Sequence, residues 1–173
     1  MEISHKLIIA PTSCGKTFLC NYLLENGYLS YRDDSNSHDD SRERVEYILI
    51  TDLANEIKSG KISCEYKNIP LKNITDNLNN KTMNKIKKFS NKKNFIIIID
   101  DLNKMIDSRS ASNKEELMNI KQTKSNIDFI FSEGRHLNIY AVALVQHYKL
   151  LSPLIRNNSK YHIIVFGSTV TVE

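Results

Sequence analysis

The 173-residue sequence has few cysteines, no apolar run of membrane-spanning length and no internal repeat, and each absence excludes a class of protein. Its three cysteines, Cys14, Cys20 and Cys64, have no metal-type spacing and form no disulfide framework, which indicates a reducing compartment. A run such as Phe95–Ile99 is far too short to cross a bilayer. The first residues lack a signal-peptide pattern, so we expect no direct membrane insertion.

The charge of the chain is small but unevenly placed. The formal net charge is +4, and the stretch Lys58–Lys93 holds ten lysines against Glu65 and Asp76, whereas Arg32–Glu46 leans acidic. A lysine-rich surface suits a polyanion such as nucleic acid, which is bound through its phosphates. A solvated helix or loop face explains the same lysines equally well, and the sequence leaves both open.

Five short apolar and β-branched runs alternate with helix-like patterns, and the length suits one domain over residues 1–173. The expected strands are His5–Ala10, Val45–Thr51, Asn94–Asp100, Ile139–Gln146 and Tyr161–Gly167. The expected helices are Lys16–Asn26, Leu53–Lys58, Lys81–Phe89, Lys114–Arg135 and Ser152–Asn157, with polar loops or insertions over 28–44 and 59–80. This alternation predicts a three-layer α/β fold around a central, mostly parallel sheet.

A phosphate-binding loop follows the first expected strand. Ala10–Thr17 matches G-x-x-x-x-G-K-S/T except at its first glycine, where alanine stands. In such loops backbone N–H groups cradle phosphate, the lysine reaches the β and γ oxygens, and the next hydroxyl binds Mg²⁺. A side chain at Gly15 would collide with the phosphate. The expected nucleotide-binding residues are Pro11, Thr12, Ser13, Cys14, Gly15, Lys16, Thr17 and Phe18.

Two carboxylates end the most apolar strand. Asp100 follows Phe95–Ile99 directly, where it is placed to act with Thr17 on a Mg²⁺ ion. Asp101 comes next and is the candidate for polarising an attacking water. The pair therefore predicts hydrolysis of ATP.

Further candidates lie near the last two expected strands. Gln146 ends the strand that begins at Ile139, where it could contact the γ-phosphate and the lytic water. Arg135 precedes that strand and Arg156 precedes the final one, so either is a candidate arginine finger acting across a subunit boundary, with Arg109 as a third.

Together these motifs resemble the genome-packaging ATPases of large DNA viruses, the poxvirus-type branch of the FtsK/HerA superfamily of P-loop NTPases. The resemblance rests on Ala10–Thr17, Phe95–Asp101, Gly134–Ile139, Gln146 and Ile155–Asn158. It implies a sheet in which the five expected strands stand in the order 5-1-4-3-2. It also implies hydrolysis of ATP with Mg²⁺, coupled to the movement of double-stranded DNA into a capsid.

By the same resemblance, Lys16 and Thr17 contact phosphate and Mg²⁺, Asp100 is the second-motif acid, Asp101 activates water and Gln146 is the sensor. Arg135 and Arg156 match motif arginines, but which one completes a neighbour's site does not carry over. The implied partners are duplex DNA, further copies in a pentameric or hexameric ring, and capsid protein. The implied location is the viral factory in the host cytoplasm, or the virion.

Three departures from the family pattern keep alternatives open. Ala10 replaces a glycine, Asp101 is one methylene shorter than the glutamate of many relatives, and the chain ends soon after the fifth expected strand, where relatives continue. A small nucleoside or nucleotide kinase shares the phosphate loop and a similar length. An ATP-binding oligomerisation module with little turnover is the other alternative.

Overall fold

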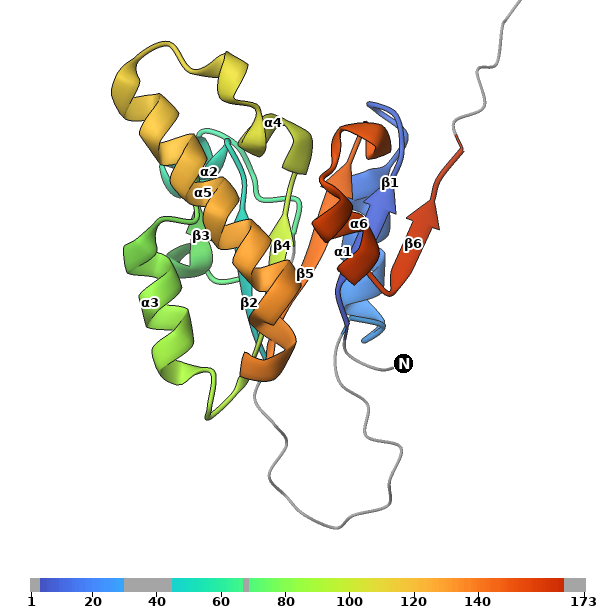
Figure 1. Ribbon diagram of the computed structural model, residues 1–173. Helices are drawn as coiled ribbons and strands as arrows, with labels where there is room; N and C mark the ends of the chain where they lie inside the picture. The colour runs from blue at the N-terminus through green and yellow to red at the C-terminus, as the bar shows by residue number, and fades with distance from the viewer. Residues whose placement is uncertain (1–3, 30–44, 67–68, 167–173) are drawn as a thin grey trace, which may run out of the picture.

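A central β-sheet of six parallel strands organises the protein. The computed structural model describes residues 4–29, 45–66 and 69–166 (Figure 1). The strands are β1 Lys6–Ile9, β2 Val45–Ile50, β3 Ile74–Thr75, β4 Asn94–Ile99, β5 Ile139–Val145 and β6 Tyr161–Ile164. Every strand pair of the described sheet is parallel, so all the strands end at one edge, which we call the carboxyl edge.

The strand order is β3-β2-β4-β5-β1-β6. In terms of the five strands expected from the sequence, this reads 2-3-4-1-5, which is the predicted order taken from the other side. The expected three-layer α/β fold is confirmed, and the sheet gains β3 as an extra edge strand. Because β4, β5 and β1 are neighbours in this order, the segments that follow them lie side by side near the middle of the carboxyl edge.

Helices cover both faces of the sheet (Figure 1). On one face, α3 Asn80–Phe89, α4 Leu102–Ile106, α5 Lys114–Glu133 and α6 Pro153–Asn158 pack on a core that includes Leu7, Ile97 and Phe131. On the other face, α1 Lys16–Glu25 and α2 Ala54–Lys58 pack on a core that includes Ile8 and Ile98. Successive residues of β1 and β4 thus enter opposite cores, which explains their continuous apolar runs.

Side-chain caps fix where three helices begin. Asn79 accepts a hydrogen bond from Thr82 N–H before α3, and Asn113 accepts one from Glu116 N–H before α5. Ser152 accepts from Ile155 N–H, and Pro153 follows it in the first turn of α6. These caps satisfy N–H groups that have no partner within their helices.

The five expected helices form, each within a few residues of its expected ends. The structure adds α4, a short helix that begins one residue after Asp101 and that the sequence pattern did not indicate.

The expectation of a polar loop over 59–80 needs correction. This segment supplies β3 and contributes Tyr66, Ile69 and Ile74 to the core under α1 and α2. Apolar residues were too sparse there to show periodicity. Of the other expected loop, over 28–44, residues 30–44 lie outside the described residues, and Leu29 is buried.

No helix in the described ranges is both long enough and apolar enough to span a bilayer.

Candidate functional site

The expected phosphate-binding loop connects β1 to α1 at the carboxyl edge. Ser13 and Gly15 have positive φ angles of 59° and 77°, so the chain turns sharply before α1 begins at Lys16. Positive φ favours glycine, and a Cβ at Gly15 would meet no atom within 4 Å, so the backbone there faces open space. A ten-residue helix then starts from the loop with its positive end toward the same space. This arrangement fits the expected phosphate-binding loop.

Lys16 lies across this loop. Its Nζ donates hydrogen bonds to the carbonyl oxygens of Ala10, at 3.0 Å, and Pro11, at 2.8 Å. The ammonium group is therefore held at the loop rather than extended into solvent.

The structure gives a reason why alanine serves at position 10. Ala10 is buried, and its N–H donates to Val145 O at 3.0 Å. It does not have the positive φ seen at Ser13 and Gly15. The position therefore does not need the conformational freedom of glycine, and a methyl group fits there.

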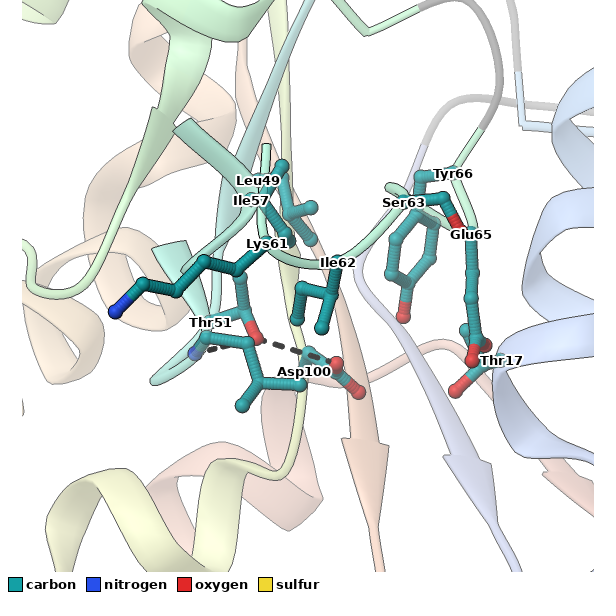
Figure 2. A pocket seen from close by; sticks show the side chains of 11 residues that line it. Thr17, Leu49, Thr51, Ile57, Lys61, Ile62, Ser63, Glu65, Tyr66 and Asp100 are labelled. Carbon is teal, nitrogen blue, oxygen red and sulfur yellow. Dashed lines mark hydrogen bonds between the residues drawn. The ribbon is translucent and has the colours of Figure 1, made fainter. Parts of the chain in front are cut away.

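Thr17 and Asp100 face each other across a pocket of about 660 Å³ beside the loop (Figure 2). The Asp100 carboxylate also lies 3.4 Å from the Thr51 hydroxyl, which donates to it. Burial raises the pKa of Asp100, and the charges of Asp101, Asp52 and Glu65 raise it further, against the lowering effect of the Tyr66 hydroxyl. A hydroxyl and a carboxylate amid several negative charges are the oxygen donors that Mg²⁺ prefers. This pair fits the expected metal site.

Tyr66 is a member of this site that the sequence did not reveal. Its side chain is 4% exposed, and its hydroxyl points toward the space between Thr17 and Asp100 (Figure 2). The hydroxyl lies close enough to influence both groups, yet it forms no well-aligned hydrogen bond within the described residues. Burial, and then the Asp100 charge, raise the pKa of Tyr66, so the phenol stays protonated and can donate.

Asp101, Gln146 and Thr12 form a hydrogen-bonded chain on the other side of the loop. Gln146 Nε2 donates to Asp101 Oδ2 at 2.8 Å, and Gln146 Oε1 accepts from the Thr12 hydroxyl at 3.1 Å. The chain thus connects the ends of β4 and β5 with the phosphate loop. The structure brings together the candidate acid, the candidate sensor and the loop.

Asp101 also has a strained backbone. Its φ is 55°, in the left-handed region that residues other than glycine seldom adopt, although aspartate does so more readily than most. The conformation starts α4 directly after the acid and turns the Asp101 carboxylate toward Gln146. Strain of this kind concentrates at functional sites, which supports a chemical role for Asp101.

Asn103 is a second residue that the sequence did not single out. Its Oδ1 accepts from the backbone N–H groups of Gln146 and His147, both at 2.9 Å, and its Nδ2 donates to His147 O at 3.2 Å. These bonds hold the chain that leaves β5 against the start of α4. Asn103 therefore fixes the position of Gln146 relative to Asp101.

The arginine candidates do not converge on this loop within one chain. Arg135 lies near His5 at the amino ends of the strands, opposite the carboxyl edge. Arg156 lies in α6, with its guanidinium carbon 5.6 Å from the centre of the Tyr148 ring. Arg109 lines a pocket of about 600 Å³ with Asp101 and Gln146, but its guanidinium is held by both Asp107 carboxylate oxygens at 2.9 Å. The finger role of each stays a prediction.

Comparison with known proteins places the fold. No protein-family model and no curated protein matches the chain. Among solved structures, the cytoplasmic domain of EssC is similar with a TM-score of 0.55 and 14% identity, over 94% of this chain and 31% of that one. EssC (ATPases 2 and 3) from Geobacillus thermodenitrificans has a TM-score of 0.55 and 12% identity, over 94% and 32%.

The pCW3 conjugation coupling protein TcpA, in a monomer form with ATPγS, has a TM-score of 0.59 and 13% identity, over 94% of this chain and 49% of that one. The chain thus spans 31–49% of the length of these proteins. At this identity the likeness concerns the fold. The chain shares its three-layer α/β fold with these solved structures.

Proposed function

We propose that this chain is the ATPase domain of a motor that translocates double-stranded DNA. The hydrogen-bonded chain from Asp101 through Gln146 to Thr12 carries the proposal, because it joins a candidate water-activating acid to the phosphate loop. Two proteins of similar fold support it: EssC has ATPase domains, and TcpA is a conjugation coupling protein whose structure contains ATPγS.

The residues divide the chemistry as follows. Lys16 and the N–H groups of the loop hold the β and γ phosphates. Thr17 and Asp100 would hold Mg²⁺, which would supply positive charge beside those phosphates. Asp101 orients the attacking water and accepts its proton, while Gln146 keeps the Asp101 carboxylate in place. Gln146 also accepts a hydrogen bond from Thr12, so it connects the acid to the loop.

The finer assignment follows from the motif resemblance. We propose that the motor packages a viral genome into a capsid, as the poxvirus-type ATPases do, and works as a pentameric or hexameric ring in the viral factory of the host cytoplasm. In that ring Arg135 or Arg156 would complete a neighbour's site. Arg135 lies at the amino ends of the strands, away from the phosphate loop of its own chain, and Arg156 lies over the Tyr148 ring.

A steady-state assay of phosphate release tests the proposal. We expect Mg²⁺-dependent hydrolysis of ATP that duplex DNA stimulates, and a loss of about 10²–10³-fold in Lys16→Ala. The matched control is Lys149→Ala, an exposed lysine beyond β5. Transfer of phosphate to a nucleoside would indicate the kinase alternative instead, and tight ATP binding without turnover would indicate the oligomerisation module. Either result would refute the motor.

A further inference from the structure

A groove lined by lysines lies at the β3 edge of the sheet, which is the lateral edge opposite β6. It has a volume of about 660 Å³ and lies between α3 and the β2–β3 edge, which Figure 1 shows side by side. We name it the lysine groove and define it by five side chains that line it: Lys58, Lys72, Lys81, Lys85 and Lys93.

The groove concentrates positive charge. Its lining contains five lysines and one carboxylate, Glu46, so its formal net charge of +4 equals that of the whole chain. Lys93 is paired with Glu46. The other four lysines are exposed and form no ion pair with any described residue.

These lysines come from both sides of the sheet. Lys81 and Lys85 stand one turn apart on α3, in the layer that holds α5. Lys58 ends α2 in the opposite layer, and Lys72 belongs to the 3₁₀ turn that leads into β3. The ammonium groups therefore surround an open edge and do not lie on a single helix face. The four residues from Lys81 to Lys85 advance about 6 Å along α3, and successive phosphates of one duplex strand advance about 3.4 Å along the duplex axis, so two such steps cover a similar length.

We propose that the lysine groove binds the phosphate backbone of duplex DNA. The inference rests on the proposed function in taking duplex DNA as the polyanion, and it assigns that contact to a surface distant from the nucleotide loop. Bound phosphates would release counterions from the DNA without reading its sequence, as a translocating motor requires.

The groove suits DNA better than an acidic peptide that would add a strand to the sheet. Of the apolar side chains that line it, Ile74, Ile86 and Phe95 are buried, at 1%, 2% and 3% exposure, and Phe89, at the end of α3, is 37% exposed. The sheet edge is also partly closed to an added strand. β3 pairs with Leu49 and Ile50, and Asn73 Nδ2 donates to Tyr47 O at 3.0 Å.

Fluorescence anisotropy with a short labelled duplex, measured over a series of salt concentrations, tests the inference. We expect Lys81→Gln/Lys85→Gln to weaken binding about tenfold, and to reduce the slope of log K against log salt by about 2, because each lost phosphate contact removes about 0.9. The matched control is Lys114→Gln/Lys121→Gln, which removes the same charge from exposed positions on α5 outside the groove. Lys81→Arg/Lys85→Arg keeps the charge and should bind like the wild type.

The outcomes separate this inference from the proposed function. The groove is not the DNA site if the groove variant and the α5 control variant lose affinity and salt dependence to the same extent, or if neither variant loses any. Groove-dependent binding of a polyglutamate peptide in place of the duplex would also overturn it.

The DNA-free ATP turnover of the groove variant should match the wild type, and Lys16→Ala should still bind DNA. A wild type that hydrolyses ATP while its groove variant binds DNA normally would refute the groove alone. A wild type without turnover whose groove variant loses DNA binding would refute the motor alone.

Discussion

The two ends of the β-sheet use polar residues in opposite ways. At the carboxyl edge, Asp101, Gln146 and Thr12 are partly or fully exposed, and their side chains bond to one another. At the amino edge, His5 is fully buried beside Phe131, with ring centres 4.9 Å apart, and its Nδ1 accepts from Ala141 N–H at 3.0 Å. The carboxyl edge leaves polar atoms available to a ligand, whereas the amino edge uses them to hold strands together. Damage at the two edges should therefore have different consequences.

The largest expected effect that sharpens this comparison is a fall in the free energy of unfolding in acid, caused by protonation of His5. Burial, then the charges of Arg135 and Lys6, lower the pKa of His5 from 6.5 to about 4. Because its Nδ1 accepts an N–H, protonation must break that bond. As the pH falls below 6.5, His5 becomes protonated in the unfolded chain, whereas in the folded chain it stays neutral until about pH 4. The free energy of unfolding should thus fall by about 3 kcal/mol across this window and stay near its full value above it.

Chemical denaturation at a series of pH values measures this effect. His5→Phe should lose the pH dependence between 6.5 and 4, along with some stability at all pH values. His136→Gln, at an exposed histidine of the same edge, should keep it. A wild type as stable at pH 4.5 as at pH 7 would contradict the burial of a neutral His5.

Next in size is the substitution Gly134→Ala, also at the amino edge. A Cβ at Gly134 would lie 2.5 Å from the backbone oxygen of Ile139 and 3.5 Å from His5 Cε1. Since backbone cannot move aside cheaply, we expect a loss of about 1–3 kcal/mol in unfolding free energy. Because Arg135 follows Gly134 directly, the readout is nucleotide binding, not turnover. The Kd for ATP of the folded variant should be unchanged, and weaker ATP binding with normal stability would break the division between the edges. Gly60→Ala does not serve as the control, because Gly60 has a φ of 75° and a side chain there would itself strain the backbone. The control is Asn119→Ala, at an exposed position of α5.

The smallest effect concerns Asn103, at the carboxyl edge. Asn103→Ala leaves the N–H groups of Gln146 and His147 without their acceptor, so Gln146 should lose its fixed position against Asp101. We expect turnover to fall about tenfold while the Kd for ATP is nearly constant, because a positioning group acts on the chemical step. Asn103→Asp retains an acceptor oxygen and should recover part of the rate. A variant with unchanged turnover but lower stability would give Asn103 a structural role only.

Much of this arrangement could be predicted from the sequence because it depends on local patterns. Continuous apolar runs such as Phe95–Ile99 identify strands buried on both faces, and a carboxylate at such a strand's end marks the carboxyl edge. The phosphate loop has a fixed spacing. These signals pointed to Asp101 and Gln146, whose side chains bond to each other beside the loop.

The remaining features depend on contacts between distant parts of the chain. Asn103 matters because it bonds to N–H groups more than forty residues away, and nothing around it in the sequence marks that role. Tyr66 lies in a polar stretch where one aromatic residue gives no periodicity, yet it reaches the Thr17–Asp100 pocket. β3 has two residues and forms only against the existing edge of β2. Such features follow from the assembled sheet and cannot be seen in a window of sequence.

The most direct test of the central claim separates binding from chemistry in Asp101→Asn. A fluorescent ATP analogue measures Kd, and single-turnover quench-flow measures the hydrolysis rate, with Asp76→Asn as the exposed control. If Asp101 activates the water, the variant should bind nucleotide within about twofold of the wild type and hydrolyse it about 10²–10⁴-fold more slowly. Hydrolysis by Asp101→Asn at the wild-type rate would contradict the account.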